Sequence, residues 1–353
     1  MSNRTCVLFQ GSGPHSAHRQ FFEPFDPVYR HFETGRPPEP GTNHDTGSEL
    51  DRIRTGRALD PSFDLIIAEG TAALQTLVAY RYLSNIGAET VFLAADETFY
   101  QVQDKPTRFL WHGLAPLTNR IDLCVSISDL VTEWLRPFLP GVPCRVVHPT
   151  TTPEKFSDLL STDPACSGDP LTLLSVGDAR PMKNYRVLVE AVQSLVKDKG
   201  IDMRLTIVGA GHPEKPYADE PFISTPGRVP IDEFADHHAS ASAYVQPSIG
   251  DGFGVAALEG MLAGLPTIVT ELVGAKQLLA DEWVTDPTVE GLASAIETLS
   301  CMSRAERIEV GRSNRNKAQS FTPSAQTDAF RDAVASVTGV AADLTAGDKK
   351  SGI

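Results

Sequence analysis

The most constraining feature of this chain is the repeated alternation of short β-rich runs with segments whose apolar residues recur at helical spacing. Most of these runs end at Gly, Ser, Asp or Pro. Alternation of this kind predicts βα units, that is, doubly wound α/β domains whose parallel sheets are covered by helices on both faces. Ligands of such sheets bind at the carboxyl ends of the strands. The predicted strands are Thr5–Phe9, Phe63–Ala68, Thr90–Ala94, Ile121–Ile127, Arg145–Val147, Leu171–Val176, Arg204–Val208, Ala243–Val245 and Thr267–Val269.

The length of the chain, 353 residues, fits two domains better than one. Residues 152–170 are polar and contain Pro and Gly, and a new strand follows them, so we place the domain boundary there. We expect one α/β domain over residues 1–160 and a second over 161–320. A further helix is expected over 321–338, followed by a frayed tail over 339–353, which has too few large apolar residues to form a core.

Three helices can be predicted from apolar stripes and end signals. Ser128 is a plausible N-cap for the first, and Gly200 ends the second. Pro323 takes the first position of the third. The three stripes are Val131, Trp134, Leu135 and Phe138; Val187, Leu188, Ala191, Val192, Leu195 and Val196; and Ala329, Phe330, Ala333, Val334 and Val337.

Composition and charge exclude several classes of function. The net charge is −14, from 45 acidic and 31 basic residues, which opposes binding to nucleic acids and gives no general affinity for anionic lipid. No apolar run approaches the ~20 residues that span a bilayer, and the apolar core of residues 1–10 is too short for a signal peptide. We therefore expect a cytoplasmic protein. Five cysteines without Cys-x-x-Cys spacing favour reduced, mostly buried thiols over a disulfide framework or a zinc site.

The segment from Ser248 to Pro266 carries the strongest functional pattern. Asp251 and Glu259 lie eight positions apart around a glycine-rich entry to a predicted helix, which Gly264 ends. Unpaired amides at the start of a helix favour anions. One carboxylate precedes the helix and the other lies inside it, so both can border a phosphate-sized pocket.

This paired-acid segment resembles the motif of retaining glycosyltransferases of family 4, which have the GT-B fold of two Rossmann-like domains facing a cleft. The family pattern is Glu-Gly-Phe-Gly, three residues, then Leu-Glu, and Asp251 replaces the first Glu. The resemblance implies that Glu259 holds the donor ribose and Asp251 the sugar hydroxyls. Sugar and phosphate would meet the backbone of Gly252, Phe253, Gly254 and Val255. It also implies a last helix that crosses back to the first domain.

A second motif, residues 171–184, places cations after a strand and ahead of a helix. A diphosphate leaving group needs positive charge that acts as the glycosidic bond breaks. The family pattern there is Gly-Arg, four residues, Lys-Gly/Asn. Lys183 and Asn184 match it, whereas the family's Arg falls on Asp178, a reversal of charge. Arg180 is a candidate to reach the phosphates in its place, and a surface turn with solvated charges is the alternative interpretation.

The remaining matches are weaker. Gly209–Gly211 precede a Gly-Arg-Val sequence, where the family holds the base with backbone near Arg228 and Val229. Gly11 and Gly13 close the first strand where family members place a glycine loop near the diphosphate. A Gly-x-Gly-x-x-Gly dinucleotide motif is not completed, because residue 16 is Ser. His112 lies where the family often has a His that contacts the transferred sugar, and a structural His is the alternative.

The resemblance implies transfer of a hexose from a nucleoside-diphosphate sugar to an acceptor with retention of configuration. The implied catalytic residues are Lys183, Asp251, Glu259 and His112. No Asp-x-Asp motif occurs, so we predict that the reaction needs no metal and no cofactor, with UDP-hexose favoured as donor. The acceptor is expected to be a lipid-linked or a soluble sugar, with contact to the membrane at most peripheral and at its inner face. Two alternatives remain open: a non-catalytic nucleotide-sugar-binding subunit, and a GT-B nucleotide-sugar epimerase or phosphorylase.

Overall fold

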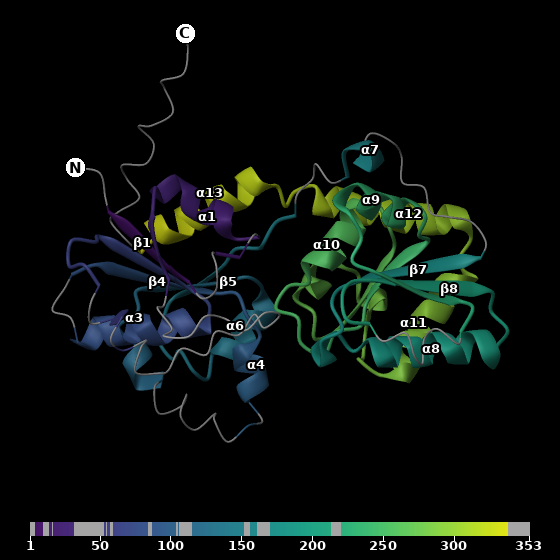
Figure 1. The fold of residues 1–353 in the computed structure, drawn as a ribbon, viewed down its shortest axis with the longest axis horizontal. Coiled ribbons are helices and arrows are strands. Elements are labelled where there is room, and N and C mark those ends of the chain that lie inside the picture. Colours follow the sequence, from purple (N-terminus) through teal and green to yellow (C-terminus); the bar gives the residue numbers. More distant parts are fainter. Residues whose placement is uncertain are drawn as a thin grey trace, which may run out of the picture. The chain divides into compact units, whose positions relative to one another are not determined.

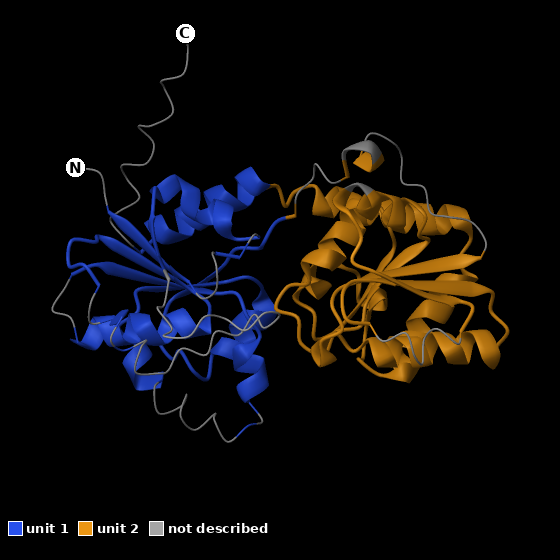
Figure 2. Ribbon diagram, in the orientation of Figure 1, with its two compact units in different colours: residues 1–150, 323–353 blue, residues 151–322 orange. Residues whose placement is uncertain are grey.

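The computed structural model divides the chain into two compact units, Met1–Thr150 with Pro323–Ile353, and Thr151–Thr322 (Figure 2). The residues that it describes are 4–9, 14–15, 17–31, 53, 55–56, 59–83, 87–103, 105, 115–151, 156–160, 170–212 and 220–337. The predicted tail and most of residues 33–61 lie outside these ranges. Within them, no helix is long and apolar enough to cross a membrane.

The second unit is built on a parallel six-stranded sheet with the order β12-β11-β10-β7-β8-β9. The chain enters at a central strand, winds outward to β9, and returns to wind outward on the other side. The order therefore reverses between β7 and β10, and the crevice at this point is where doubly wound sheets bind ligands. The strands are β7 (Leu171–Val176), β8 (Met203–Val208), β9 (Ile223–Gly227), β10 (Ala243–Gln246), β11 (Thr267–Thr270) and β12 (Val284–Thr285).

Helices cover both faces of this sheet (Figure 1). The helices α8 (Tyr185–Lys197) and α11 (Val289–Cys301) lie on one face. The other face carries α9 (Ile231–Ala239), α10 (Val255–Leu262) and α12 (Arg304–Ala318). The short helix α7 (Ser157–Leu160) and the 3-10 turns Pro181–Lys183, Gly274–Leu278 and Asp281–Trp283 complete the unit.

The first unit contains a second parallel six-stranded sheet, with the order β2-β1-β3-β4-β5-β6. Its order reverses between β1 and β3. The strands are β1 (Thr5–Phe9), β2 (Val28–His31), β3 (Leu65–Glu69), β4 (Glu89–Ala94), β5 (Leu123–Ser126) and β6 (Cys144–Val146). Figure 1 shows α3 (Thr71–Leu83), α4 (Thr98–Val102) and α6 (Asp129–Leu135) below this sheet, and α1 (Arg19–Phe22) and α13 (Pro323–Ala335) above it.

The C-terminal helix α13 belongs to the first unit through an aromatic cluster. The ring of Phe330 stacks on that of Phe21 with centroids 5.2 Å apart, and it meets Phe22 and Phe25 edge-on at 6.0 Å each. All four rings are buried, and burial of an aromatic side chain stabilises a fold by about 1.5–3 kcal/mol. The prediction that the last helix packs on the N-terminal region is confirmed. Ala329, predicted on the packed face, is exposed.

Each of the nine predicted strands is present, with ends shifted by two residues or fewer. Ser128 caps α6 as predicted, because its side chain accepts a hydrogen bond from the backbone N–H of Val131. Pro323 begins α13. Beyond these nine, the structure contains the edge strands β2, β9 and β12. The N-terminal glycines Gly11 and Gly13 and the candidate His112 lie outside the described residues.

Candidate active site

Three loops of the second unit meet the carboxyl edge of its sheet near the point where the strand order reverses. Residues 177–184 join β7 to α8, residues 209–212 follow β8, and residues 247–254 join β10 to α10. The first and third of these loops follow the two strands that flank the reversal. The chemistry-bearing residues predicted from the sequence in this half of the chain lie mostly in these loops.

The glycine-rich loop before α10 is held from two sides. The N–H of Asp251 donates to the carbonyl of Leu272, and the carbonyl of Asp251 accepts from the N–H of Gly274. Gly254 is the N-cap of α10 with φ +85, where a Cβ would lie 2.7 Å from Val273 Cγ1. Both the backbone angle and the contact therefore require glycine. The loop places the first amides of α10, a site that favours anions, at the edge of the sheet.

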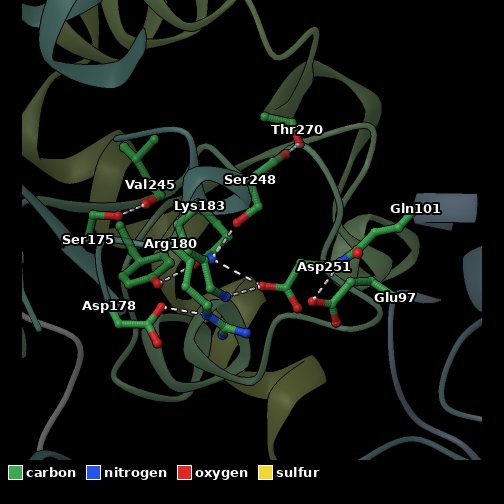
Figure 3. Close-up of polar contacts among 12 residues, drawn as sticks. Glu97, Gln101, Ser175, Asp178, Arg180, Lys183, Val245, Ser248, Asp251 and Thr270 are labelled. Carbon is green, nitrogen blue, oxygen red and sulfur yellow. Dashed lines mark hydrogen bonds and ion pairs between the residues drawn. The ribbon is translucent and has the colours of Figure 1, made fainter. Parts of the chain in front are cut away.

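Lys183 and Asp251 form an ion pair between the first and third loops (Figure 3). Lys183 Nζ lies 2.6 Å from Asp251 Oδ2, and their side chains are only 17% and 15% exposed. Gln246 Nε2, at the end of β10, donates to the same carboxylate oxygen at 3.3 Å and to Ser248 Oγ at 2.9 Å. Two residues that the resemblance assigns to the donor site are thus in direct contact.

Glu259 lies in the second turn of α10 and is buried. Its Oε1 accepts a hydrogen bond from Thr151 Oγ1 at 3.0 Å, and Thr151 is buried as well. A buried carboxylate that keeps such a partner is suited to accept further hydrogen bonds from the hydroxyl groups of a ligand. No sequence motif predicts the role of Thr151, because it lies 108 positions from Glu259.

Asp178, the reversal of charge in the first loop, is paired within that loop. Arg180 Nε donates to Asp178 Oδ1 at 2.8 Å, and the two side chains are 58% and 45% exposed. Partial burial acts to raise the pKa of Asp178, but the hydrogen bond from Arg180 and the charges of Arg180 and Lys183 outweigh it and lower that pKa. The carboxylate therefore lies among cations at this edge of the sheet.

The turns after β7 and β8 approach each other closely. A Cβ at Gly209 would lie 1.8 Å from the carbonyl oxygen of Gly177, so this contact requires glycine. His212 Nε2 is 2.8 Å from the same carbonyl oxygen, and its ring meets that of Tyr185 edge-on. Burial raises the pKa of the Tyr185 hydroxyl, which lies against Gly177.

The predicted base-binding residues directly follow β9. Gly227 is the last residue of that strand, and its carbonyl accepts from the N–H of Gly209. Arg228 is exposed and Val229 is partly buried. They lie beyond β8, two strands away from β7 in the sheet. The structure places them at the same edge as the three loops, and their role stays a prediction.

The first unit contains a buried pair that the sequence analysis did not identify. His18 Nδ1 lies 2.8 Å from Glu69 Oε1, with side chains 5% and 8% exposed. The backbone N–H of His15 donates to both carboxylate oxygens of Glu69, at 3.2 and 3.3 Å. The rings of His15 and His18 have centroids 5.1 Å apart. Burial and the charge of His18 lower the pKa of His15, against the opposing charge of Glu69.

This pair lies where the strand order of the first unit reverses. Glu69 ends β3, and both histidines follow β1, its neighbour in the sheet. The signal that could have identified the pair was an acidic residue at the end of an otherwise apolar run, Leu65–Glu69.

Comparisons with known proteins cover different parts of the chain. Residues 170–301 match the model of the family described as Glycosyl transferases group 1. The D-inositol 3-phosphate glycosyltransferase of Paenarthrobacter aurescens (strain TC1) is 29% identical over 214 residues, which are 55% of this chain and 51% of that protein. The phosphatidyl-myo-inositol mannosyltransferase of Mycobacterium leprae (strain TN) is 28% identical over 177 residues, 48% and 46% of the two proteins. The matched region spans about half the length of these relatives.

Solved structures resemble the chain over almost its whole length. Sucrose-phosphate synthase from Thermosynechococcus elongatus has a TM-score of 0.73 at 15% identity, over 95% of this chain and all (100%) of that one. Anabaena HepE in complex with UDP and glucose has a TM-score of 0.69 at 16% identity, over 95% and 100%. At these identities the likeness shows the fold.

Two parallel doubly wound sheets, a C-terminal helix that returns to the first unit, and these structural neighbours define a protein of the GT-B fold class. Within that class, the part of the chain that matches a family model is residues 170–301, which are similar to the glycosyl transferases group 1.

Proposed function

We propose that this protein transfers a hexose from a nucleoside-diphosphate sugar to an acceptor with retention of configuration. The observation that carries the proposal is the ion pair of Lys183 with Asp251. Asp251 lies in the loop just before α10, the helix that contains the buried Glu259. A cation and the amides at the start of a helix can bind the diphosphate of a nucleotide sugar, and two carboxylates can bind its hydroxyl groups. The match of residues 170–301 to the glycosyl transferases group 1 supports the same reaction.

Lys183 would stabilise the leaving diphosphate, with Arg180 as a second cation. Charge develops on the diphosphate as the glycosidic bond breaks, so a cation fixed beside it lowers the barrier. The amides from Gly252 to Val255 would face the sugar and the phosphate, since the start of a helix favours anions. No general base is assigned, because the leaving phosphate itself can receive the acceptor proton in a front-face mechanism.

Glu259 would hold the donor ribose and Asp251 the hydroxyls of the sugar. Both are acceptors for hydroxyl donors when ionised. The backbone near Arg228 and Val229 would hold the base. UDP-hexose is the favoured donor, and its support is that Anabaena HepE, a structural neighbour, was solved with UDP and glucose.

The acceptor side is proposed to involve the first unit. The His18–Glu69 pair lies at the switch point of that unit's sheet, where doubly wound folds bind ligands. A histidine oriented by a carboxylate can hold an acceptor hydroxyl through its other ring nitrogen. Two matched relatives are named as a D-inositol 3-phosphate glycosyltransferase and a phosphatidyl-myo-inositol mannosyltransferase. We therefore propose a polyol or a lipid-linked sugar alcohol as acceptor. A lipid-linked acceptor would require peripheral contact with a membrane.

The test combines nucleotide binding with product analysis. Thermal-shift screening of UDP, GDP, their sugars, ATP and NAD identifies the donor base, because a ligand at 100 times its Kd stabilises by about 2.7 kcal/mol. The donor that binds is then incubated with inositol phosphates and lipid-linked acceptors, with and without EDTA. We expect an axial (retained) linkage that forms equally in EDTA. Binding of NAD or ATP in place of the nucleotide sugars, or an inverted product, contradicts the proposal.

The alternative of a non-catalytic binding subunit rested on the reversed charge of Asp178. Its pairing with Arg180 weakens that alternative, since the carboxylate is already accompanied by a cation. Binding of a donor without any turnover across the acceptor panel would restore it. Isomerised sugar formed from donor alone would instead favour an epimerase.

A further inference from the structure

Two cysteines face each other on neighbouring strands of the first unit. Cys124 on β5 and Cys144 on β6 are direct partners in the parallel register, so their side chains leave the sheet on the same face. Neighbouring strands lie about 4.7–4.9 Å apart, and disulfides span Cα separations of about 4.4–6.8 Å. The backbone therefore already has a spacing that a disulfide can bridge. Both thiols are free in the structure.

The two thiols have unequal surroundings. Cys124 is fully buried, whereas Cys144 is partly exposed on β6, the last strand of its sheet. Cys144 Sγ, when protonated, makes a long contact of 3.6 Å with the carbonyl of Val142. Cys144 is thus the member of the pair that a small molecule in solution can reach, and Cys124 is reached through it.

The pKa values of the two thiols also differ, and the more accessible Cys144 has the lower one. The hydrogen bond from the Cys124 thiol lowers the pKa of Cys144 to about 7, helped by the charges of Arg136 and Arg145 and opposed by burial. The same hydrogen bond, together with burial, raises the pKa of Cys124. The lowered pKa increases the share of Cys144 that is thiolate at neutral pH, the form that reacts with oxidants and electrophiles.

We propose that Cys144 is an oxidation site for hydrogen peroxide and organic hydroperoxides, with Cys124 as its resolving thiol. The Cys144 thiolate attacks a peroxide oxygen, the O–O bond breaks, and a proton taken up by the leaving oxygen gives water or an alcohol and a sulfenic acid at Cys144. The Cys124 sulfur then attacks the Cys144 sulfur, the S–O bond breaks, and the Cys124 proton leaves with the hydroxyl as water. Two thiols are oxidised to one disulfide, and one peroxide is reduced.

The product would link the edge strand β6 covalently to β5. Sulfenic acids that meet no second thiol go on to irreversible sulfinic and sulfonic acids. A resolving thiol in register prevents that step and leaves a bond that thiol reductants reopen. This inference does not depend on the proposed transfer of sugar, and its test needs no substrate.

The experiment uses the full chain, treated with substoichiometric peroxide and analysed by mass spectrometry. Cys124 and Cys144 lie in one tryptic peptide, residues 121–145, because the bond after Arg136 precedes Pro137 and resists trypsin. We expect this peptide to lose two hydrogens before the peptides of Cys6, Cys166 or Cys301 change. Cleavage at Glu133 should leave its halves joined until a reductant is added. First oxidation at the exposed Cys301, or no disulfide at excess peroxide, overturns the proposal.

Two variants separate the roles of the thiols. Cys124→Ser keeps a hydroxyl donor beside Cys144, so a dimedone-trapped sulfenic acid should appear at Cys144 in place of the disulfide. Cys124→Ala removes that donor, and the pH midpoint of Cys144 alkylation should rise from about 7 toward the ordinary thiol value of about 8.5. An unchanged midpoint in Cys124→Ala contradicts the pairing of the two thiols. Circular dichroism of both variants checks that the fold is kept.

Discussion

Lys183 and Asp251 lie 68 positions apart in the chain and form an ion pair with a distance of 2.6 Å in the second unit. The cation assigned to the diphosphate is neutralised by the carboxylate assigned to the sugar. Gln246 holds the carboxylate from a second direction. In the free protein Lys183 pairs with Asp251. In the proposed donor complex the phosphate and Asp251 would both interact with this one lysine. The relative strength of these two interactions decides how well a nucleotide binds before its sugar is considered.

Replacement of the lysine should abolish most of the transfer. Lys183→Met keeps the aliphatic stem and removes the charge that stabilises the leaving diphosphate. We expect kcat/KM for the donor to fall by about 10²–10³-fold, about 2.7–4 kcal/mol of lost transition-state stabilisation. Initial rates of UDP release measure it. Lys199→Met, which breaks an exposed pair with Glu297 in the same unit, is the matched control and should leave kcat/KM unchanged. Equal losses in the two variants contradict the role of Lys183.

Neutralising Asp251 should affect nucleotide and nucleotide sugar in opposite directions. Asp251→Asn frees Lys183 for the phosphates, so UDP alone should bind at least about twofold more tightly, because even exposed ion pairs contribute about 0.2–1 kcal/mol and this pair is mostly buried. Turnover of UDP-sugar should fall at least tenfold, because the sugar hydroxyls lose a charged acceptor. Calorimetric titration with UDP and rate measurements with UDP-sugar give the two values. Weaker binding of both ligands would show that Asp251 positions the lysine and does not compete for it.

Glu259→Gln should weaken donor binding while the fold is kept. The amide oxygen of Gln can still accept from Thr151 Oγ1, the partner of Glu259 Oε1. A hydrogen bond to a charged group contributes about 1.5–3 kcal/mol, so the donor KM should rise about 10- to 100-fold and the nucleotide-dependent rise in Tm should shrink. Glu290→Gln, at the exposed start of α11, is the control. An unchanged KM in Glu259→Gln removes the assigned contact with the ribose.

The strands and the loops of this site follow from local sequence, whereas its contacts do not. Apolar runs ending in turn residues predict β7 and β10, and the glycines predict tight turns that the structure contains, including Gly254 at positive φ. The edge strands β2 and β12 escape prediction because Val28–His31 and Val284–Thr285 are short and lack a fully buried apolar run. The partnerships of Lys183 with Asp251 and of Thr151 with Glu259 arise only when distant segments pack together, so neither has a signal in the sequence.

The Asp178–Arg180 pair predicts that a second substitution, at Asp178, restores the donor KM lost by a substitution at Arg180. Arg180→Gln removes the hydrogen-bonded cation of Asp178 and leaves a carboxylate near the proposed phosphate site. The donor KM should rise by a few fold, since exposed pairs are worth about 0.2–1 kcal/mol. The double variant Asp178→Asn with Arg180→Gln removes both charges and should recover most of that loss. A double-mutant cycle on donor KM measures the coupling. Additive effects would mean that Arg180 acts on the phosphates without regard to Asp178.

The His18–Glu69 pair should matter for the acceptor and not for the donor. Glu69→Gln keeps a hydrogen-bonding group beside His18 Nδ1 but removes the charge that orients and polarises the imidazole. We expect kcat/KM for the acceptor to fall at least tenfold, about 1.4 kcal/mol, while UDP-dependent thermal stabilisation and slow hydrolysis of the donor stay unchanged. Asp96→Asn is the control. Asp96 follows the adjacent strand β4 and accepts hydrogen bonds from the backbone N–H groups of Thr71 and Thr98. Its replacement should lower the stability of the protein and should not change kcat/KM for the acceptor more than donor hydrolysis. A parallel loss of donor hydrolysis and acceptor transfer in Glu69→Gln would mark the pair as a structural element of the first unit.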